Sequence, residues 1–201
     1  MRIGLTGGIG SGKTTVARLL QEAGAAIVDT DAIARSLTLA GGVAMPAIRQ
    51  QFGADFIAPD GALDRDRMRA VAFSDPLARQ RLEAILHPLI TAQALAEADA
   101  AVSPLVVFDV PLLVESKRWR SRVARVLVID CSEQTQIDRV LQRPGWTRER
   151  LAGALAAQTS RQARRAVADA VLLNDGITLN ELSNEVRSLA ARWGCETITA
   201  P

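Results

Sequence analysis

The sequence predicts an α/β fold in which one parallel sheet of five strands carries helices on both faces. Five short, nearly continuous apolar runs indicate buried parallel strands, and longer helical patterns separate them. A doubly wound fold of this kind binds its ligands beyond the carboxyl ends of its strands, so polar residues at those ends matter most. The five runs are residues 2–6, 26–29, 105–110, 125–130 and 170–173.

The length predicts one α/β core with an insertion. A chain of 201 residues is too short for two large independent domains, so we expect a single domain over residues 1–201. The 24 basic and 22 acidic residues leave a formal net charge of +2, which argues against a nucleic-acid partner. Small anionic ligands fit this balance better.

The chain is expected to work in the cytoplasm without a membrane partner. Cys131 and Cys195 stand far apart, so neither a disulfide scaffold nor a zinc site is expected, and both thiols should be inert. The amino-terminal segment has no signal-peptide pattern, and no apolar run approaches the length of a membrane span. A monomer is compatible with these features, and the sequence leaves an oligomer open.

The long interval between the second and third runs, residues 32–104, predicts an inserted helical subdomain. It is too long for one crossover helix and contains several helix-like runs separated by turns. Residues 74–76 have the form of an N-cap followed by proline in the first turn of a helix. They are expected to open a long helix that ends near residue 100, with a break at His87 and Pro88.

A second helical excursion, residues 132–168, is rich in arginine. Within it, residues 139–160 are expected to form a helical lid, with a break between helices at residues 144–145. Arginines that close over phosphate groups neutralise the charge that develops on a transferring phosphoryl group. Arg139 and Arg143 are favoured because their i, i+4 spacing places them on one helix face. Most of the other arginines are expected to be ordinary surface residues.

A glycine-rich motif follows the first run directly. Residues 7–14 match the pattern G-x-x-x-x-G-K-[ST] between a predicted strand and a predicted helix. The glycines let backbone N–H groups face phosphate oxygens. Lys13 is expected to reach the β- and γ-phosphates, and the Thr14 hydroxyl is expected to bind magnesium. Only Lys13 and Lys117 are lysine in this arginine-rich chain, so position 13 requires a compact ammonium group. The expected nucleotide contacts are Gly8, Ile9, Gly10, Ser11, Gly12, Lys13, Thr14 and Thr15.

Joined to the predicted sheet, this motif indicates the three-layer sandwich of the P-loop NTPases. ATP and Mg²⁺ are the expected cofactors. The motif alone does not separate kinases from switch GTPases or motor ATPases. Other residues must therefore decide the reaction.

Acidic residues at two strand ends favour a kinase. Asp29 and Asp31 follow the second run, where a carboxylate can accept the proton of an attacking hydroxyl. We expect Asp31 to be this base; the alternative is that Asp31 merely caps the next helix. Asp109 ends the third run as a Walker-B aspartate would and is expected to hold magnesium, although any strand can end in aspartate.

Four segments, taken in this order, resemble the dephospho-CoA kinase family. They read TGGIGSGK at residues 6–13, DTDAIAR at 29–35, LHPLI at 86–90 and DVPLLVE at 109–115. Weaker matches extend the resemblance over nearly the whole chain. The phosphate loop is generic, but its combination with the other three segments is specific.

The resemblance implies a P-loop kinase that transfers a phosphoryl group from ATP to the ribose 3′-hydroxyl of dephospho-CoA. CoA and ADP would be the products, as the last step of CoA biosynthesis, and residues 32–104 would help to bind the CoA moiety. Residues 161–174 would lie near the adenine side of the ATP site. The catalytic residues implied are Lys13, Asp31, Arg139 and Arg143, the substrate contacts are Asp31, Arg35, His87, Leu112 and Arg161, and Arg143 and Asn174 would contact ATP.

Two details of the resemblance leave alternatives open. Residues 144–146 read Pro-Gly-Trp where the family more often has an acidic residue, so the lid tip is expected to differ. His87 is the sole histidine, and a histidine before proline is equally well explained as a packing element.

Other classes match less well. A shikimate- or gluconate-type kinase also pairs a phosphate loop with acids after the second strand, but shikimate kinases would carry a glycine-rich motif where this chain has residues 111–113, Pro-Leu-Leu. A nucleoside monophosphate kinase fits the Asp-x-Asp segment poorly. A GTP-dependent switch would carry Asp-x-x-Gly after the third strand and Asn-Lys-x-Asp as a base reader, and the sequence contains neither in those places.

Overall fold

The computed structural model describes residues 1–116 and 118–194, and these residues form two compact units. The first unit contains residues 1–28 and the chain from residue 101 onward, and the second contains Asp29–Ala100. Lys117 and Cys195 lie outside the described residues. Within the described part of the chain, no helix combines the length and the apolar character needed to cross a membrane.

A parallel sheet of five strands forms the first unit, and its strand order is β2-β3-β1-β4-β5. This order makes β1 the central strand: β1 pairs Ile3 with Val107 of β3, and Leu5 with Leu127 of β4. The sequence prediction of five parallel strands is confirmed, with ends that differ by no more than one residue. The strands are β1 (Arg2–Gly7), β2 (Ala26–Asp29), β3 (Val106–Asp109), β4 (Arg125–Asp130) and β5 (Ala170–Leu173).

Alternate residues of β1 face opposite layers of helices, as the two-residue period of a strand requires. Ile3 and Leu5 are fully buried in the core beneath α1 (Lys13–Glu22) and α10 (Leu179–Arg192). Gly4 faces the other way, where a Cβ atom would lie 2.2 Å from Leu113 Cδ1 of the short helix α6 (Leu113–Ser116). A glycine at position 4 therefore lets the helical layer approach the sheet closely.

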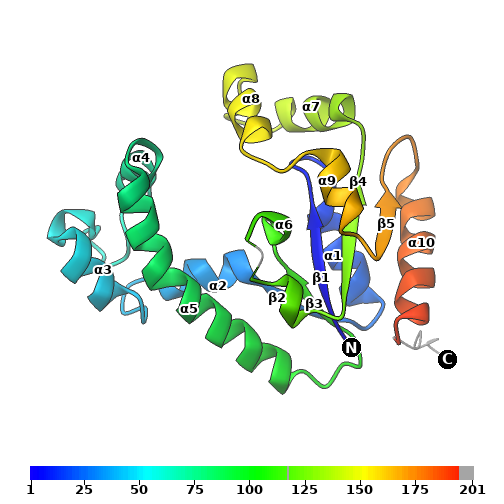
Figure 1. Cartoon of the computed structure of the whole chain (residues 1–201), viewed down its shortest axis with the longest axis horizontal. Helices are drawn as coiled ribbons and strands as arrows, with labels where there is room; N and C mark the ends of the chain where they lie inside the picture. Colours follow the sequence, from blue (N-terminus) through cyan, green and yellow to red (C-terminus); the bar gives the residue numbers. More distant parts are fainter. Residues whose placement is uncertain (117, 195–201) are drawn as a thin grey trace. The chain divides into compact units, whose positions relative to one another are not determined.

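Three helices lie between β4 and β5 in the chain, and each begins at a hydroxyl N-cap. The side chains of Ser132, Thr147 and Ser160 each accept a hydrogen bond from the backbone N–H three residues further on, at 3.2 Å. These caps open α7 (Glu133–Leu141), α8 (Arg148–Ala156) and α9 (Arg161–Ala166). Figure 1 shows α7 and α8 beyond the carboxyl ends of the strands, where ligands of such folds bind. A one-turn 3₁₀ helix, η2 (Arg120–Arg122), precedes β4.

The second unit is helical and is organised around one long helix. Helix α5 (Pro76–Ala100) packs against α2 (Thr30–Leu37), α3 (Met45–Phe52) and α4 (Arg65–Ser74). A small core of apolar side chains, which includes Ile33, Ile48 and Met68, is buried among them.

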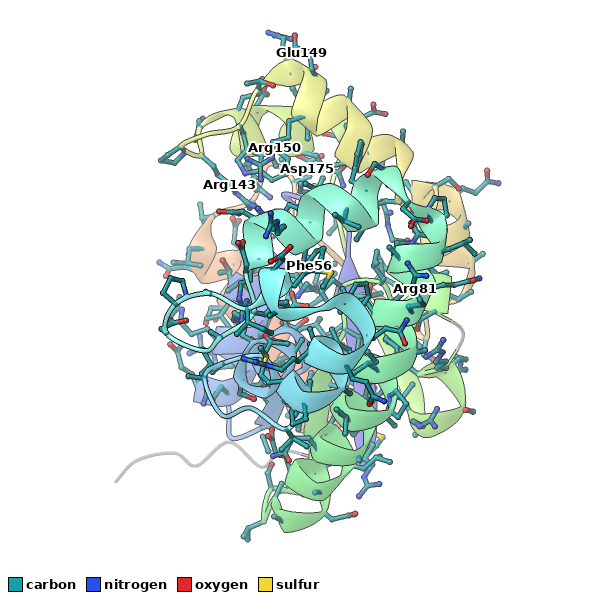
Figure 2. The ribbon with its side chains drawn as sticks, turned by 90° about the vertical axis from the view of Figure 1, so that its left-hand side faces the viewer. Phe56, Arg81, Arg143, Glu149, Arg150 and Asp175 are labelled. Carbon is teal, nitrogen blue, oxygen red and sulfur yellow. The ribbon has the colours of Figure 1, made fainter. Side chains whose placement is uncertain are left out.

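An aromatic pair joins α3 to the 3₁₀ turn η1 (Ala54–Phe56), with ring centroids of Phe52 and Phe56 5.6 Å apart. Arg81 lies over Phe52 and Arg67 over Phe56, at 5.9 and 5.8 Å from the ring centroids. Phe56 and Arg81 are labelled in Figure 2.

The expected break in the long helix is wrong. Helix α5 runs through His87 and Pro88 without interruption, and its N-cap is Asp75, which accepts the N–H of Leu77 at 2.8 Å; Ser74 is the last residue of α4. Proline at position 88 removes one hydrogen bond to the carbonyl of Ala84. Pro88 and Ala84 are both exposed, so water can donate a hydrogen bond to the Ala84 carbonyl and the helix continues.

Candidate active site

The phosphate loop connects β1 to α1 in a conformation that leaves an open helix end. Gly10 and Gly12 adopt φ values of 77° and 94°, and Ser11 N–H donates to the Gly8 carbonyl at 3.0 Å. Gly12 is the N-cap of α1 and has no side chain with which to satisfy the first N–H groups of the helix. These groups, with the positive end of the helix dipole, form a site for phosphate oxygens.

Close neighbours explain why the loop needs its glycines. A Cβ atom at Gly8 would lie 2.2 Å from Gln136 Nε2, and one at Gly12 would lie 2.2 Å from Asn174 Nδ2. The Asn174 amide donates to the Ser11 carbonyl at 2.8 Å, and both residues are buried. Asn174, which the sequence placed in the ATP site, thus supports the loop from the end of β5.

Lys13 and Asp109 meet at the centre of the site. Lys13 Nζ forms an ion pair with Asp109 Oδ1, and the two side chains are 18% and 10% exposed. Asp109 ends β3, which lies next to β1, so the sheet itself brings the two groups together. Thr14 and Thr15 occupy the first turn of α1, with Thr14 exposed. Lys13 and Asp109 are therefore in contact, and Thr14 and Thr15 follow Lys13 directly in the helix.

The two arginines favoured for the lid differ in their surroundings. Arg139, in the last turn of α7, directs Nη1 toward the carbonyls of Gly10 and Ser11 at 3.4 and 3.5 Å. The prediction that Arg143 shares its helix face is wrong, because α7 ends at Leu141 and Arg143 lies beyond it, exposed. The Pro144-Gly145 turn stops the helix early, with Gly145 at φ 76°.

The turn at residues 144–146 is held together by an arginine and a tryptophan. Arg150 stacks over the Trp146 ring at 4.4 Å and donates to the Gly145 carbonyl at 2.9 Å. Figure 2 shows Glu149 pointing away from Arg143 and Arg150. The residues that depart from the family pattern therefore form an ordered turn of their own.

Arg161 is oriented by a buried carboxylate that the sequence analysis did not select. Asp130, 4% exposed at the end of β4, accepts from Arg161 Nε at 2.8 Å and from Nη2 at 2.8 Å. Arg165 Nη1 lies 3.3 Å from the same carboxylate. The hydrogen bonds to Asp130 raise the pKa of the Arg161 guanidinium above its ordinary value. Asp130 could have been found from the sequence, because it is the acid that ends the fourth apolar run, just as Asp109 ends the third.

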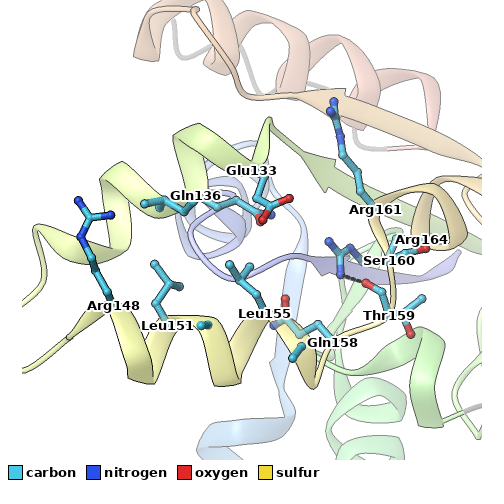
Figure 3. Close-up of a pocket in the computed structure, with 13 residues that line it drawn as sticks. Glu133, Gln136, Arg148, Leu151, Leu155, Gln158, Thr159, Ser160, Arg161 and Arg164 are labelled. Atoms are coloured by element: carbon cyan, nitrogen blue, oxygen red, sulfur yellow. Dashed lines mark hydrogen bonds between the residues drawn. The ribbon is translucent and has the colours of Figure 1, made fainter.

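A cavity of about 670 Å³ lies among α7, α8 and α9. Its lining includes the apolar residues Ile137, Leu151 and Leu155 and the polar residues Gln158 and Arg164. Figure 3 shows Leu151, Leu155, Gln158 and Arg164 around the cavity. Gln158 Oε1 accepts the N–H of Ile9 at 3.1 Å, so the cavity adjoins the phosphate loop. An amphipathic cavity beside a phosphate site suits an organic phosphate ligand.

Three residues that the sequence predicted to contact the acceptor belong to the second unit: Asp31, Arg35 and His87. Asp29 is the N-cap of α2 and accepts the N–H groups of Asp31 and Ala32 at 2.8 and 2.9 Å. The alternative that Asp31 caps this helix is therefore wrong, and the Asp31 carboxylate is exposed in the first turn. Arg35 Nη2 lies 3.7 Å from Asp29 Oδ2, and His87 is half-buried in the middle of α5.

Two further predicted residues lie in the first unit. Leu112, which precedes α6, is 49% exposed. Cys131 is fully buried after β4, and burial raises the pKa of its thiol, which agrees with the expectation that it is inert.

The geometry of the first unit defines a class of protein. A phosphate loop on the central strand, with its lysine paired to the acid that ends the next strand, characterises the P-loop kinases and related NTPases. The family model for dephospho-CoA kinase matches residues 1–180. Dephospho-CoA kinase of Burkholderia thailandensis is 55% identical over 99% of this chain and 98% of that protein, and that of Albidiferax ferrireducens is 51% identical over 96% and 93%.

The chain belongs to the dephospho-CoA kinase family. It is a transferase that phosphorylates dephospho-CoA with ATP in the biosynthesis of CoA.

Solved structures give the same fold. A crystal structure of TT1252 from Thermus thermophilus is 33% identical, covers 96% of this chain and 97% of that one, and has a TM-score of 0.83. Dephospho-CoA kinase from Campylobacter jejuni, 20% identical over 96% of each chain with a TM-score of 0.69, shares the fold. Shikimate kinase from Acinetobacter baumannii also shares it, at 18% identity and a TM-score of 0.54 over 95% and 93% of the chains. The family match favours dephospho-CoA over shikimate as the acceptor.

Proposed function

We propose that the acceptor atom is the ribose 3′-hydroxyl of dephospho-CoA and that the ATP triphosphate lies in the loop Gly8–Gly12. The ion pair between Lys13 and Asp109 is the observation that supports the place of the triphosphate, and the family match supports dephospho-CoA as the acceptor. A lysine held at the mouth of a phosphate loop exchanges its carboxylate partner for the β- and γ-phosphates when the nucleotide binds. The exchange keeps the ammonium group paired throughout.

Magnesium fits the residues present. The Thr14 hydroxyl and the Asp109 carboxylate are hard oxygen ligands, which Mg²⁺ prefers, and both belong to the first unit. Thr14 and Asp109 would hold the ion together with water and the phosphates. Bound there, Mg²⁺ supplies neutralisation of the charge on the β- and γ-phosphate oxygens.

Arginines of the lid stabilise the transferring group in this proposal, and Arg161 of α9 contacts the substrate. Arg139 is already held against the loop carbonyls, and Arg161 is presented by Asp130 at the rim of the cavity (Figure 3). Both are therefore oriented before ATP binds, so little reorganisation is required. Arg143 is exposed beyond α7 and would engage only as the lid closes over ATP.

Asp31 is the proposed base. Asp29 performs the capping, which leaves the exposed Asp31 carboxylate available to accept the proton of the attacking hydroxyl. Arg35, His87 and Leu112 are proposed to contact the acceptor, with residues 32–104 holding the CoA moiety and residues 139–160 acting as the lid. The proposed setting is the cytoplasm, without a nucleic-acid or membrane partner. The net charge of +2 supports the absence of a nucleic-acid partner.

Product analysis with wild-type protein and an Asp31→Asn variant tests the proposal. The protein is mixed with ATP, Mg²⁺ and dephospho-CoA, shikimate or gluconate; ADP release is followed, and the product is located by mass and ³¹P NMR. We expect a 3′-phosphorylated product from dephospho-CoA alone, and a fall of about 10²- to 10⁴-fold in kcat for Asp31→Asn with ATP affinity unchanged.

Asp66→Asn is the matched control, because Asp66 is an exposed first-turn acid of the same unit. A product phosphorylated elsewhere would refute the acceptor atom. Normal turnover in Asp31→Asn would remove Asp31 as the base.

A further inference from the structure

Glu115 has a contact that the reaction scheme above does not use. It lies in α6, six residues after the end of β3, and its Oε1 accepts the backbone N–H of Thr159 at 2.8 Å. Its second oxygen, Oε2, is buried and has no hydrogen-bond partner among the described residues. Within the described part of the chain, only one of the two carboxylate oxygens has a hydrogen-bond partner. The bond from the Thr159 N–H therefore fixes the position of the carboxylate.

Thr159 belongs to residues 157–160, the connection between α8 and α9, which we call the lid root. The neighbouring residue, Gln158, accepts the N–H of Ile9 in the phosphate loop at 3.1 Å. Arg164, 7% exposed, donates to the Thr159 carbonyl, as the dashed line in Figure 3 shows. The lid root is thus tied to α6, to the phosphate loop and to α9 at once.

The contacts form a closed path that starts and ends at the phosphate loop. Thr6, just before the loop, donates its hydroxyl hydrogen bond to the Pro111 carbonyl at 3.1 Å, which fixes the chain that leads into α6. From α6 the path runs through Glu115 to Thr159, and from Gln158 back to Ile9. Each link is a single hydrogen bond, so loss of the Glu115 link would leave the lid root held only by the contacts of Arg164 and Gln158.

We propose that Glu115 is a positioning residue that anchors the lid root and, through Gln158, sets the conformation of the phosphate loop at Ile9. Glu115 acts by accepting the Thr159 N–H and not by its negative charge. The inference rests on the proposed seating of the ATP phosphates in this loop. A loop that is set before binding loses less conformational freedom when ATP binds, so the anchor increases ATP affinity.

Three substitutions separate the hydrogen bond from the charge. Glu115→Gln keeps an acceptor oxygen for Thr159, whereas Glu115→Ala removes it and Glu115→Asp shortens the side chain by one methylene group. We expect KM for ATP to rise about tenfold or more in Glu115→Ala and Glu115→Asp, with a much smaller change in kcat. Glu115→Gln should stay close to wild type, and Glu185→Ala, an exposed acid on α10, is the control.

Amide exchange of Ile9, followed by NMR on the ATP-free protein, gives a readout that does not depend on activity. Exchange should accelerate in Glu115→Ala and in Gln158→Ala but not in Glu115→Gln. Their effects on KM should also be non-additive in the double variant, because both changes break the same path.

A Glu115→Gln variant as impaired as Glu115→Ala would overturn the proposal in favour of a charge role, and so would an Ile9 exchange rate that Glu115→Ala leaves unchanged. If Glu115→Ala fails to fold, Glu115→Asp and Gln158→Ala carry the same test. Lys13→Ala identifies a failure of the underlying assignment: normal ATP affinity in that variant would reject the seating of the phosphates, while the Ile9 exchange would still decide the role of Glu115.

Discussion

Asp175 links the loop after β5 to the start of α7 through its carboxylate. It accepts the Thr135 hydroxyl at 2.5 Å and the Ser132 N–H at 2.8 Å. The hydrogen bond from Thr135, followed by those from Ser132, lowers the pKa of Asp175 from 3.8 to about 2. Because the unfolded chain binds the proton more tightly, the ionised carboxylate stabilises the fold above pH 3.8, and this contribution is lost as the pH falls toward 2.

Asp175→Asn should therefore lower the melting temperature by a few degrees at neutral pH, and the difference from wild type should vanish near pH 2. Thermal unfolding followed by circular dichroism between pH 2 and 7 measures this dependence. Asp138→Asn is the control, since Asp138 is an exposed acid of α7 whose carboxylate accepts from Gln134. A difference for Asp175→Asn that is independent of pH would show that the carboxylate acts without its charge.

At the scale of elements, helix α5 tolerates a proline that helices usually exclude. Pro88 occupies an exposed position in the interior of α5, where it removes the hydrogen bond to Ala84. Pro88→Ala should restore that bond and raise the free energy of unfolding by about 1–3 kcal/mol. Urea unfolding measures the change, and Gln80→Ala on the same helix should shift stability by less than about 0.5 kcal/mol. A loss of stability in Pro88→Ala would mean that the proline ring makes packing contacts that outweigh the missing bond.

The elements that the sequence predicted well are those fixed by local pattern. Apolar runs placed the five strands, and the glycine motif placed the phosphate loop, because both signals depend on neighbouring residues. The end of α7 before Arg143 was missed since the i, i+4 spacing outweighed the Pro144-Gly145 turn, and the continuity of α5 was missed because exposure of Pro88 is a tertiary property.

The support of the site could not be predicted in this way. Gln158 meets Ile9 across 149 residues of sequence, and Asp130 meets Arg161 across 31. No local periodicity records such pairs, so only the folded chain reveals which polar residues hold the loop and its arginines in place.

For the whole molecule, the phosphate site predicts how ATP changes stability. The loop, Lys13 and Asp109 all lie in the first unit, and ATP that binds only the folded chain stabilises it by about 2.7 kcal/mol at a hundred times its dissociation constant. For a chain of this size, that corresponds to a rise of about 5–10 °C in melting temperature. Lys13→Ala should abolish most of the rise, because the ammonium group is proposed to make the main charge contact with the phosphates. Arg18→Ala, which removes an exposed cation from the same helix, should keep it. Differential scanning calorimetry with and without Mg²⁺-ATP measures both variants.

A full rise in Lys13→Ala would place the nucleotide elsewhere on the chain, and an equal loss in both variants would indicate general attraction by positive charge instead of a site built around Lys13.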